Sequence, residues 1–272
     1  MHTEPHSLRV GEGPSARDIA VLHAPGHAGP GLFWLGGFRS DMIGTKATSI
    51  AELAAAHGLD STRFDYSGHG VSKGRFEDGT IGRWLDESEA VFERVTRGPQ
   101  ILIGSSMGGW MALLLARKLA ERGLGARLRA LVLIAPAPDF TEALMWRRFP
   151  EDVRQIILRD GIWHQPSLYS DEPYPITRAL IEEGRRHLLL GGPIPIEAPV
   201  RILQGMQDPD VPWEHALELV DKLEAPSVLL TLVKDGDHRL SRDGDIALLH
   251  ETILALAGRA RSVVPPQAEL NP

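Results

Sequence analysis

The chain has 272 residues, of which 43% are hydrophobic, and its 29 basic and 36 acidic residues give a formal net charge of -7. This length suits one large domain, and the acidic balance without a long basic run argues against nucleic acid and anionic membranes as partners. The absence of cysteine excludes disulfides, thiolate metal ligands and a cysteine nucleophile.

The first fifteen residues are polar and show neither a secretory signal nor an Arg-rich presequence. No apolar stretch of the sequence has the length needed to cross a bilayer. We therefore expect a soluble, cytoplasmic protein without a membrane span. The sequence leaves its oligomeric state open.

Short apolar runs alternate with longer helical patterns along the chain. The strand candidates, most of which contain Leu, Ile or Val, are residues 20–23, 32–35, 62–65, 101–103, 131–134, 201–203 and 228–233. Helical patterns separate many of them and also follow the last one, at residues 46–57, 81–96, 107–122, 214–223 and 243–256. Because continuous apolar strands are typical of a sheet covered on both faces, the pattern predicts an α/β fold with a mostly parallel central sheet and helices on both faces.

One interval, residues 140–199, breaks this alternation and contains helical patterns at 142–149, 151–159 and 176–190 but no good strand. We interpret it as a small helical cap inserted into a core made of residues 1–139 and 200–261. Its large side chains could line a substrate pocket or only attach the cap, and these are Phe140, Met145, Trp146, Trp163, Tyr169 and Tyr174. Residues 262–272, with three prolines, are predicted to be a flexible tail.

The sequence Gly104-Ser105-Ser106-Met107-Gly108 follows a strand candidate and leads into a helix candidate. A G-x-S-x-G sequence in this context is typical of a nucleophile elbow, a sharp turn that exposes a serine hydroxyl at the carboxyl edge of a sheet. The pentapeptide alone is weak evidence, so the flanking strand and helix decide its interpretation. We therefore predict that Ser106 is a nucleophile.

A serine nucleophile needs a general base and an acid that orients the base. Asp208 follows a strand candidate and is our prediction for the acid, with Asp210 on the same turn as the alternative. His238 follows the next strand candidate and is the predicted base, because it completes the chain order serine, aspartate, histidine. His69 is the alternative base, although it precedes the serine.

Gly36-Gly37-Phe38 ends another strand candidate, where the glycines allow a close approach of the backbone. We predict that the backbone amides of Phe38 and Met107 form an oxyanion hole for a tetrahedral acyl-transfer intermediate. The alternative is that the glycines make only a tight turn. This chemistry requires no metal and no organic cofactor.

Several of these motifs together resemble the α/β-hydrolase family over most of the chain. They are Gly36-Gly37-Phe38, residues 63–70, Gly104 to Gly108, Gln204 to Pro212 and Gly236-Asp237-His238. A narrower resemblance is to a branch that removes S-palmitoyl groups from proteins and cleaves acyl glucuronides, and it rests on residues 44–47, 64–68, 98–102, 104–110, 193–195, 205–206 and 211–213. The resemblance implies an α/β-hydrolase fold, with Ser106, Asp208 and His238 at the triad positions.

The sequence thus predicts a serine carboxylesterase or thioesterase that forms an acyl-enzyme with a small-molecule or acylated-protein substrate. A perhydrolase or a carbon-carbon bond hydrolase could use the same triad in a differently shaped pocket. A non-catalytic ligand-binding protein on a hydrolase scaffold is the alternative from a different class. Acyl chain length and leaving group are not predicted.

Overall fold

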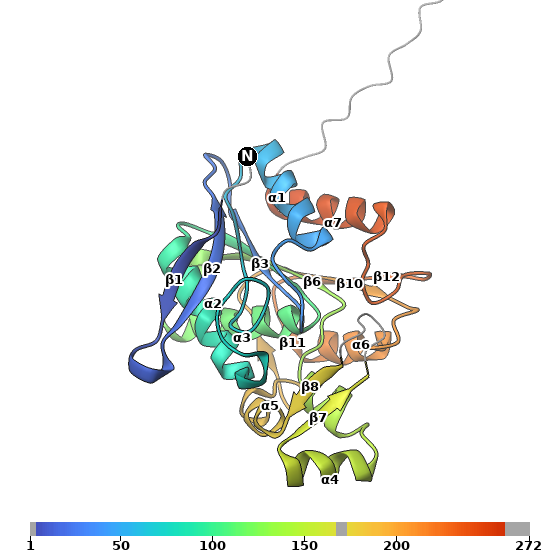
Figure 1. Cartoon of the computed structure of the whole chain (residues 1–272). Helices are drawn as coiled ribbons and strands as arrows, with labels where there is room; N and C mark the ends of the chain where they lie inside the picture. Colours follow the sequence, from blue (N-terminus) through green and yellow to red (C-terminus); the bar gives the residue numbers. More distant parts are fainter. Residues whose placement is uncertain (1–3, 167–172, 259–272) are drawn as a thin grey trace, which may run out of the picture.

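The computed structural model describes residues 4–166 and 173–258. Within these ranges, one central sheet has eight strands in the order β1-β2-β4-β3-β5-β6-β10-β12 (Figure 1). The strands are β1 (His6–Val10), β2 (Arg17–Ala24), β3 (Gly31–Leu35), β4 (Ser61–Phe64), β5 (Gln100–Ser105), β6 (Leu128–Ile134), β10 (Val200–Gly205) and β12 (Val228–Val233). The predicted tail at residues 262–272 lies outside the described residues.

From β4 to β12 the neighbouring strands run parallel, whereas β1 and β2 are antiparallel to their neighbours. The carboxyl ends of the parallel strands therefore meet at one edge of the sheet. The loops after β3, β5, β10 and β12 gather there, and ligands bind at this edge in open parallel sheets.

Helices cover both faces of the sheet (Figure 1). Helices α1 (Thr45–His57) and α7 (Asp243–Leu256) pack on one face, and α2 (Ile81–Val95), α3 (Met107–Glu121) and α6 (Trp213–Lys222) pack on the other. Within β5, Ile101 and Ile103 face the helices α1 and α7, whereas Leu102 faces the helices α2, α3 and α6. Both faces are apolar for this reason, which explains the continuous apolar runs in the sequence.

The seven predicted strands and five predicted helices outside the 140–199 interval all coincide with elements of this core. Strand β1 was not predicted. It lies at the sheet edge and its residues are mainly exposed, so it lacks the apolar run that marks the inner strands. The other short elements are 3-10 turns at Gly13–Ser15, Phe76–Asp78 and Gly125–Arg127, and the parallel pair β9 (Ile194–Pro195) and β11 (Leu223–Glu224), of which β9 belongs to the 140–199 interval.

Between β6 and β10 the chain leaves the central sheet. It forms a π-helical turn (Thr141–Trp146), α4 (Glu151–Asp160), the antiparallel pair β7 (Ile162–Gln165) and β8 (Tyr174–Thr177), α5 (Arg178–Gly184) and a 3-10 turn (Arg185–His187). The expectation that this interval has no strand is wrong, as is the continuous helix expected over 176–190. Neither β7, which includes His164 and Gln165, nor β8, which includes Pro175, has the continuous apolar run that marks the inner strands.

The interval has an apolar cluster of its own, made of Phe149, Val153, Ile157, Ile176 and Ile181. Its C-terminal part is attached to the core by Asp139, whose buried carboxylate accepts the backbone N–H groups of Leu189 and Leu190 at 2.8 and 2.9 Å. Desolvation by burial raises the pKa of Asp139. Figure 1 shows α4 and the β7–β8 pair as a separate layer beside the central sheet.

Candidate active site

Ser106 lies at the turn between β5 and α3, with φ 55° and ψ -118°. A positive φ is uncommon for a residue with a side chain and indicates local backbone strain. Two glycines make the turn possible: a Cβ on Gly104 would collide with the backbone of Gly108, and a Cβ on Gly108 would collide with the carbonyl group of Leu35. The geometry is that of a nucleophile elbow.

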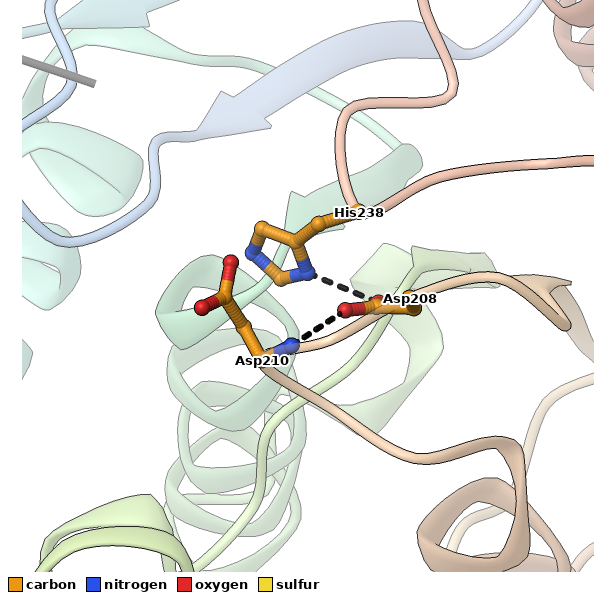
Figure 2. Close-up of side chains that lie close together, drawn as sticks. All are labelled: Asp208, Asp210 and His238. Atoms are coloured by element: carbon orange, nitrogen blue, oxygen red, sulfur yellow. Dashed lines mark hydrogen bonds and ion pairs between the residues drawn. The ribbon is translucent and has the colours of Figure 1, made fainter. Parts of the chain in front are cut away.

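His238 and Asp208 approach Ser106 from the loops after β12 and β10. Nε2 of His238 lies 3.1 Å from Oγ of Ser106, and Nδ1 of His238 lies 2.8 Å from Oδ2 of Asp208. Figure 2 shows the imidazole directing this nitrogen at Asp208. An imidazole with its proton on Nδ1 donates to Asp208 and accepts from the serine hydroxyl. The three predicted side chains therefore form one hydrogen-bonded chain.

The carboxylate of Asp208 is completely buried and its two oxygens are engaged. Oδ1 accepts the backbone N–H groups of Asp210 and Val211, each at 2.9 Å. Oδ2 accepts a hydrogen bond from Nε2 of Gln204 at 3.2 Å in addition to that from His238. These four donors fix the carboxylate in the orientation that the imidazole requires.

Asp210, the alternative acid, follows on the same turn and lines the pocket in front of Ser106. Figure 2 shows its carboxylate beside the His238 ring, away from the nitrogen that faces Asp208. The bond from Nδ1 of His238 goes to Asp208. The geometry therefore favours Asp208 over Asp210 as the orienting acid.

Asp208, Asp210 and His238 each place a potential metal-ligand atom within 4.8 Å of the others. Both nitrogens of His238 already have hydrogen-bond partners, and both oxygens of Asp208 accept hydrogen bonds. A cation would have to break the bond between His238 and Ser106 or the bond between His238 and Asp208. The donor set therefore fits proton transfer better than metal binding.

The loop after β3 lies against the elbow. A Cβ on Gly37 would be 3.5 Å from Cβ of Ser106 and 3.3 Å from the carbonyl oxygen of Ser105. In the described part of the chain, neither the N–H of Phe38 nor that of Met107 donates to a backbone acceptor. Met107 begins α3, where an N–H has no acceptor within the helix. Two such amides beside the predicted nucleophile, Ser106, match the requirement of an oxyanion hole.

A pocket of about 470 Å³ lies in front of Ser106. One wall is apolar and consists of Phe38, Phe140, Leu144, Met145 and Phe149. Charged side chains line another part, namely Arg39, Lys46, Asp210 and Arg239. The pocket can therefore accept an apolar acyl chain beside a polar group.

The large side chains of the 140–199 interval divide into two sets. Phe140, Met145 and Tyr174 line the pocket. Trp146 instead lies under the Arg185 guanidinium, 5.1 Å from ring centre to Cζ, and Trp163 packs on Phe149 with ring centroids 5.2 Å apart. Tyr169 lies outside the described residues.

The sequence did not identify two further side chains at the site. Gln204 donates a hydrogen bond to Asp208. The sequence feature that could have identified Gln204 is its position as a polar residue near the end of a buried apolar strand. Lys46 donates to the carbonyl oxygen of Arg239 and to Oγ of Ser241, which joins α1 to the loop that carries His238. Desolvation by burial lowers the pKa of Lys46 to about 8. Its partners are distant in the sequence, so the local pattern at residues 44–47 does not reveal these contacts.

His69, the alternative base, is buried with 3% of its surface exposed. Its Nε2 accepts the backbone N–H of Arg39 at 3.1 Å. The imidazole of His69 is thus hydrogen-bonded to the loop after β3. The imidazole that is hydrogen-bonded to the hydroxyl of Ser106 is that of His238.

Residues 21–249 match the alpha/beta hydrolase family, and the chain belongs to this family. It is a hydrolase with the predicted α/β-hydrolase fold. It is similar to mouse "Palmitoyl-protein thioesterase ABHD10, mitochondrial", with 38% identity over 237 residues, covering 87% of this chain and 78% of that protein. This confirms the resemblance to the depalmitoylating branch of the family.

Two solved structures are similar over nearly the whole chain. Mouse alpha/beta hydrolase domain-containing protein 10 has a TM-score of 0.82 at 35% identity, covering 92% of this chain and 98% of that one. A putative hydrolase from Agrobacterium vitis S4 has a TM-score of 0.91 at 49% identity, covering 93% of this chain and 98% of that one.

The predicted cytoplasmic location is wrong by this comparison, because the curated relatives are named as mitochondrial proteins. The prediction used the composition of the first fifteen residues and the lack of an apolar stretch long enough to cross a bilayer, and neither feature determines the compartment. Among the helices of the described residues, none has the length and apolar character to cross a membrane.

Proposed function

We propose that this hydrolase cleaves carboxylic esters or acyl thioesters with Ser106 as nucleophile, His238 as general base and Asp208 as the orienting acid. The observation that carries the proposal is the hydrogen-bonded chain from Asp208 through His238 to a serine on a strained elbow. Relatives named palmitoyl-protein thioesterases support a thioester of a fatty acid as substrate, on a small molecule or a protein.

In the acylation step, Oγ of Ser106 attacks the carbonyl carbon while Nε2 of His238 takes the hydroxyl proton. Asp208 stabilises the imidazolium through Nδ1–H. The amides of Phe38 and Met107 donate to the oxyanion that forms on the substrate. The intermediate then expels the thiol or alcohol, which takes the proton from Nε2, and the acyl group stays on Oγ.

In the deacylation step, His238 removes a proton from water as the water oxygen attacks the acyl carbon. The second tetrahedral intermediate releases the fatty acid, and the proton on Nε2 returns to Oγ of Ser106. The side chains supply all the proton transfers, so the proposal includes no metal and no organic cofactor.

We further propose that residues 140–199 are a cap over the core of residues 1–139 and 200–261. Phe140, Leu144, Met145 and Phe149 come from this interval and form most of the apolar wall. An acyl chain bound along this wall would have its carbonyl group beside Ser106. The leaving group would then lie near the charged side chains of the pocket.

The test is hydrolysis of p-nitrophenyl butyrate and of palmitoyl thioester by the wild type, Ser106→Ala and Ser105→Ala. Ser105 is the matched control because it is the neighbouring serine and also lines the pocket. We expect Ser106→Ala to lose at least about 10⁴-fold in kcat, as for other serine hydrolases that lose the nucleophile. Ser105→Ala should retain activity within about tenfold.

Mass spectrometry after reaction with a fluorophosphonate should locate the adduct on the peptide that contains Ser106, and Ser105→Ala should still be labelled. An adduct that persists in Ser106→Ala, or undiminished turnover by that variant, would refute the proposal. A folded wild type that is neither labelled nor active would support the non-catalytic alternative.

A further inference from the structure

We propose that His69 is a positioning residue for the oxyanion hole: its Nε2 accepts the N–H of Arg39 and thereby fixes the adjacent amide of Phe38 beside Ser106. The inference rests on the proposed function, because it assigns a role within the same acyl-transfer site. His69 does not contact the substrate in this role. It acts through the backbone of the loop after β3.

The hydrogen bond to His69 is located at a strained point of this loop. Arg39 has φ 57°, a backbone conformation that costs free energy for a residue with a side chain. Such a conformation persists only where surrounding contacts stabilise it. The N–H of Arg39 donates to Nε2 of His69 at 3.1 Å, directly after the peptide unit that carries the proposed oxyanion donor.

The position of His69 is itself fixed on several sides. Its ring centroid lies 5.0 Å from that of Phe76, 5.2 Å from that of Trp84 and 5.6 Å from that of Tyr66. The backbone N–H of His69 donates to the backbone carbonyl oxygen of Tyr66 at 2.9 Å. The backbone carbonyl oxygen of His69 accepts the backbone N–H of Ser72 at 3.0 Å. The acceptor at Nε2 is therefore held rigidly.

The side chain of Phe38 packs into the same aromatic cluster. Its ring lies 4.8 Å from Phe76 and 6.1 Å from Trp84, centroid to centroid. Phe76 and Trp84 thus contact both Phe38 and His69. The cluster holds the ring of Phe38, while His69 holds the backbone that follows it.

The hydrogen bonds also define the protonation state that this role requires. An imidazole that accepts at Nε2 carries its proton on Nδ1, which faces the carbonyl oxygen of Ser67 at 3.3 Å. Desolvation by burial lowers the pKa of His69 to about 4. His69 is therefore neutral at the pH of hydrolysis and remains an acceptor.

The test compares His69→Gln with His69→Met, two side chains of similar length and shape. The glutamine carbonyl can accept the N–H of Arg39, whereas the methionine side chain offers no comparable acceptor. We expect His69→Met to lose about 10²-fold in kcat, because one oxyanion donor is misplaced, with KM within about threefold of the wild type. His69→Gln should recover most of this loss.

A second readout separates positioning from general damage to the fold. A trifluoromethyl ketone forms a tetrahedral oxyanion with the nucleophilic serine, whereas the corresponding secondary alcohol occupies the pocket without one. Affinity for the ketone should fall in His69→Met by the same factor as kcat/KM, and affinity for the alcohol should stay within about threefold. Melting temperatures of both variants show whether they fold.

Equal kcat values for His69→Met and the wild type would overturn the inference. A parallel loss of ketone and alcohol affinity would also overturn it, since that pattern indicates a distorted pocket. If His69→Met does not fold, His69→Gln alone decides: ketone affinity within about tenfold of the wild type supports the inference, and a larger selective loss contradicts it. A wild type without fluorophosphonate labelling or turnover would contradict the proposed function itself.

Discussion

The backbone N–H of Asp210 donates to Oδ1 of Asp208 at 2.9 Å, so the two carboxylates share one turn but have different surroundings. Asp208 is buried and bonds to Nδ1 of His238, whereas Asp210 lines the pocket. The short interval between them in the sequence made both candidates for the acid. Their hydrogen bonds distinguish them.

Asp208→Asn should lower kcat by about 10³ to 10⁴-fold, because an amide at this position no longer orients and stabilises the imidazolium of His238. Asp210→Asn should remain within about tenfold of the wild type. Steady-state hydrolysis of p-nitrophenyl butyrate by both variants measures the difference. A larger loss in Asp210→Asn than in Asp208→Asn would reverse the assignment.

Leu144→Trp should shorten the acyl chain that the enzyme accepts, because Leu144 lies on the apolar wall and tryptophan fills part of the pocket. The ratio of kcat/KM for palmitoyl to butyryl thioester should fall by about tenfold or more. Leu158→Trp is the matched control, since Leu158 belongs to α4 and is 40% exposed. The proposed acyl site is wrong if the two variants show the same ratio.

The sequence predicts the core of the fold well because its signals are local. Inner strands are buried on both faces, so their apolar runs are continuous, and the elbow requires glycines at two fixed positions, Gly104 and Gly108. The loops with Asp208 and His238 follow strands directly. Parallel strands bring such loops to the same edge, which explains why these side chains were found together.

Features that depend on distant contacts could not be predicted in this way. Lys46 and Gln204 lie within motifs of the family resemblance. These motifs do not reveal that Lys46 bonds to the loop after β12 or that Gln204 bonds to Asp208. His69 is the alternative base by its location in Tyr66-Ser67-Gly68-His69-Gly70, although the chain order disfavours it. Its partner, the N–H of Arg39, is visible only once the chain is folded.

Lys46→Met should change how stability depends on pH. Burial lowers the pKa of Lys46 to about 8 in the folded chain, whereas an unfolded lysine titrates near about 10.4. Between these two pKa values the unfolded chain binds more protons than the folded chain, so this lysine makes the free energy of unfolding rise with pH. Below about pH 8 the lysine is charged in both states, and its burial lowers the free energy of unfolding by the full amount.

The difference in free energy of unfolding, wild type minus Lys46→Met, should therefore rise between pH 8 and 10 by on the order of 2 kcal/mol. Urea denaturation at several pH values measures it. Lys73→Met, at a side chain that is 79% exposed, reports the general effect of removing a lysine charge. A difference that is flat with pH, or that falls, would contradict the buried ammonium.

Gly108→Ala should damage both stability and activity, because the added Cβ meets the carbonyl group of Leu35 at the end of β3. Backbone atoms cannot rotate away as a side chain can, so β3 and α3 must separate, which displaces the loop with Phe38 from Ser106. We expect a loss of about 2 to 4 kcal/mol in the free energy of unfolding and at least about 10²-fold in kcat. Gly36→Ala is the matched control. Gly36 lies on the loop with Phe38, and a Cβ added to Gly36 would have its nearest neighbour at 3.8 Å. Thermal denaturation and thioester hydrolysis of the two variants test the steric argument, which fails if Gly36→Ala is as damaging as Gly108→Ala.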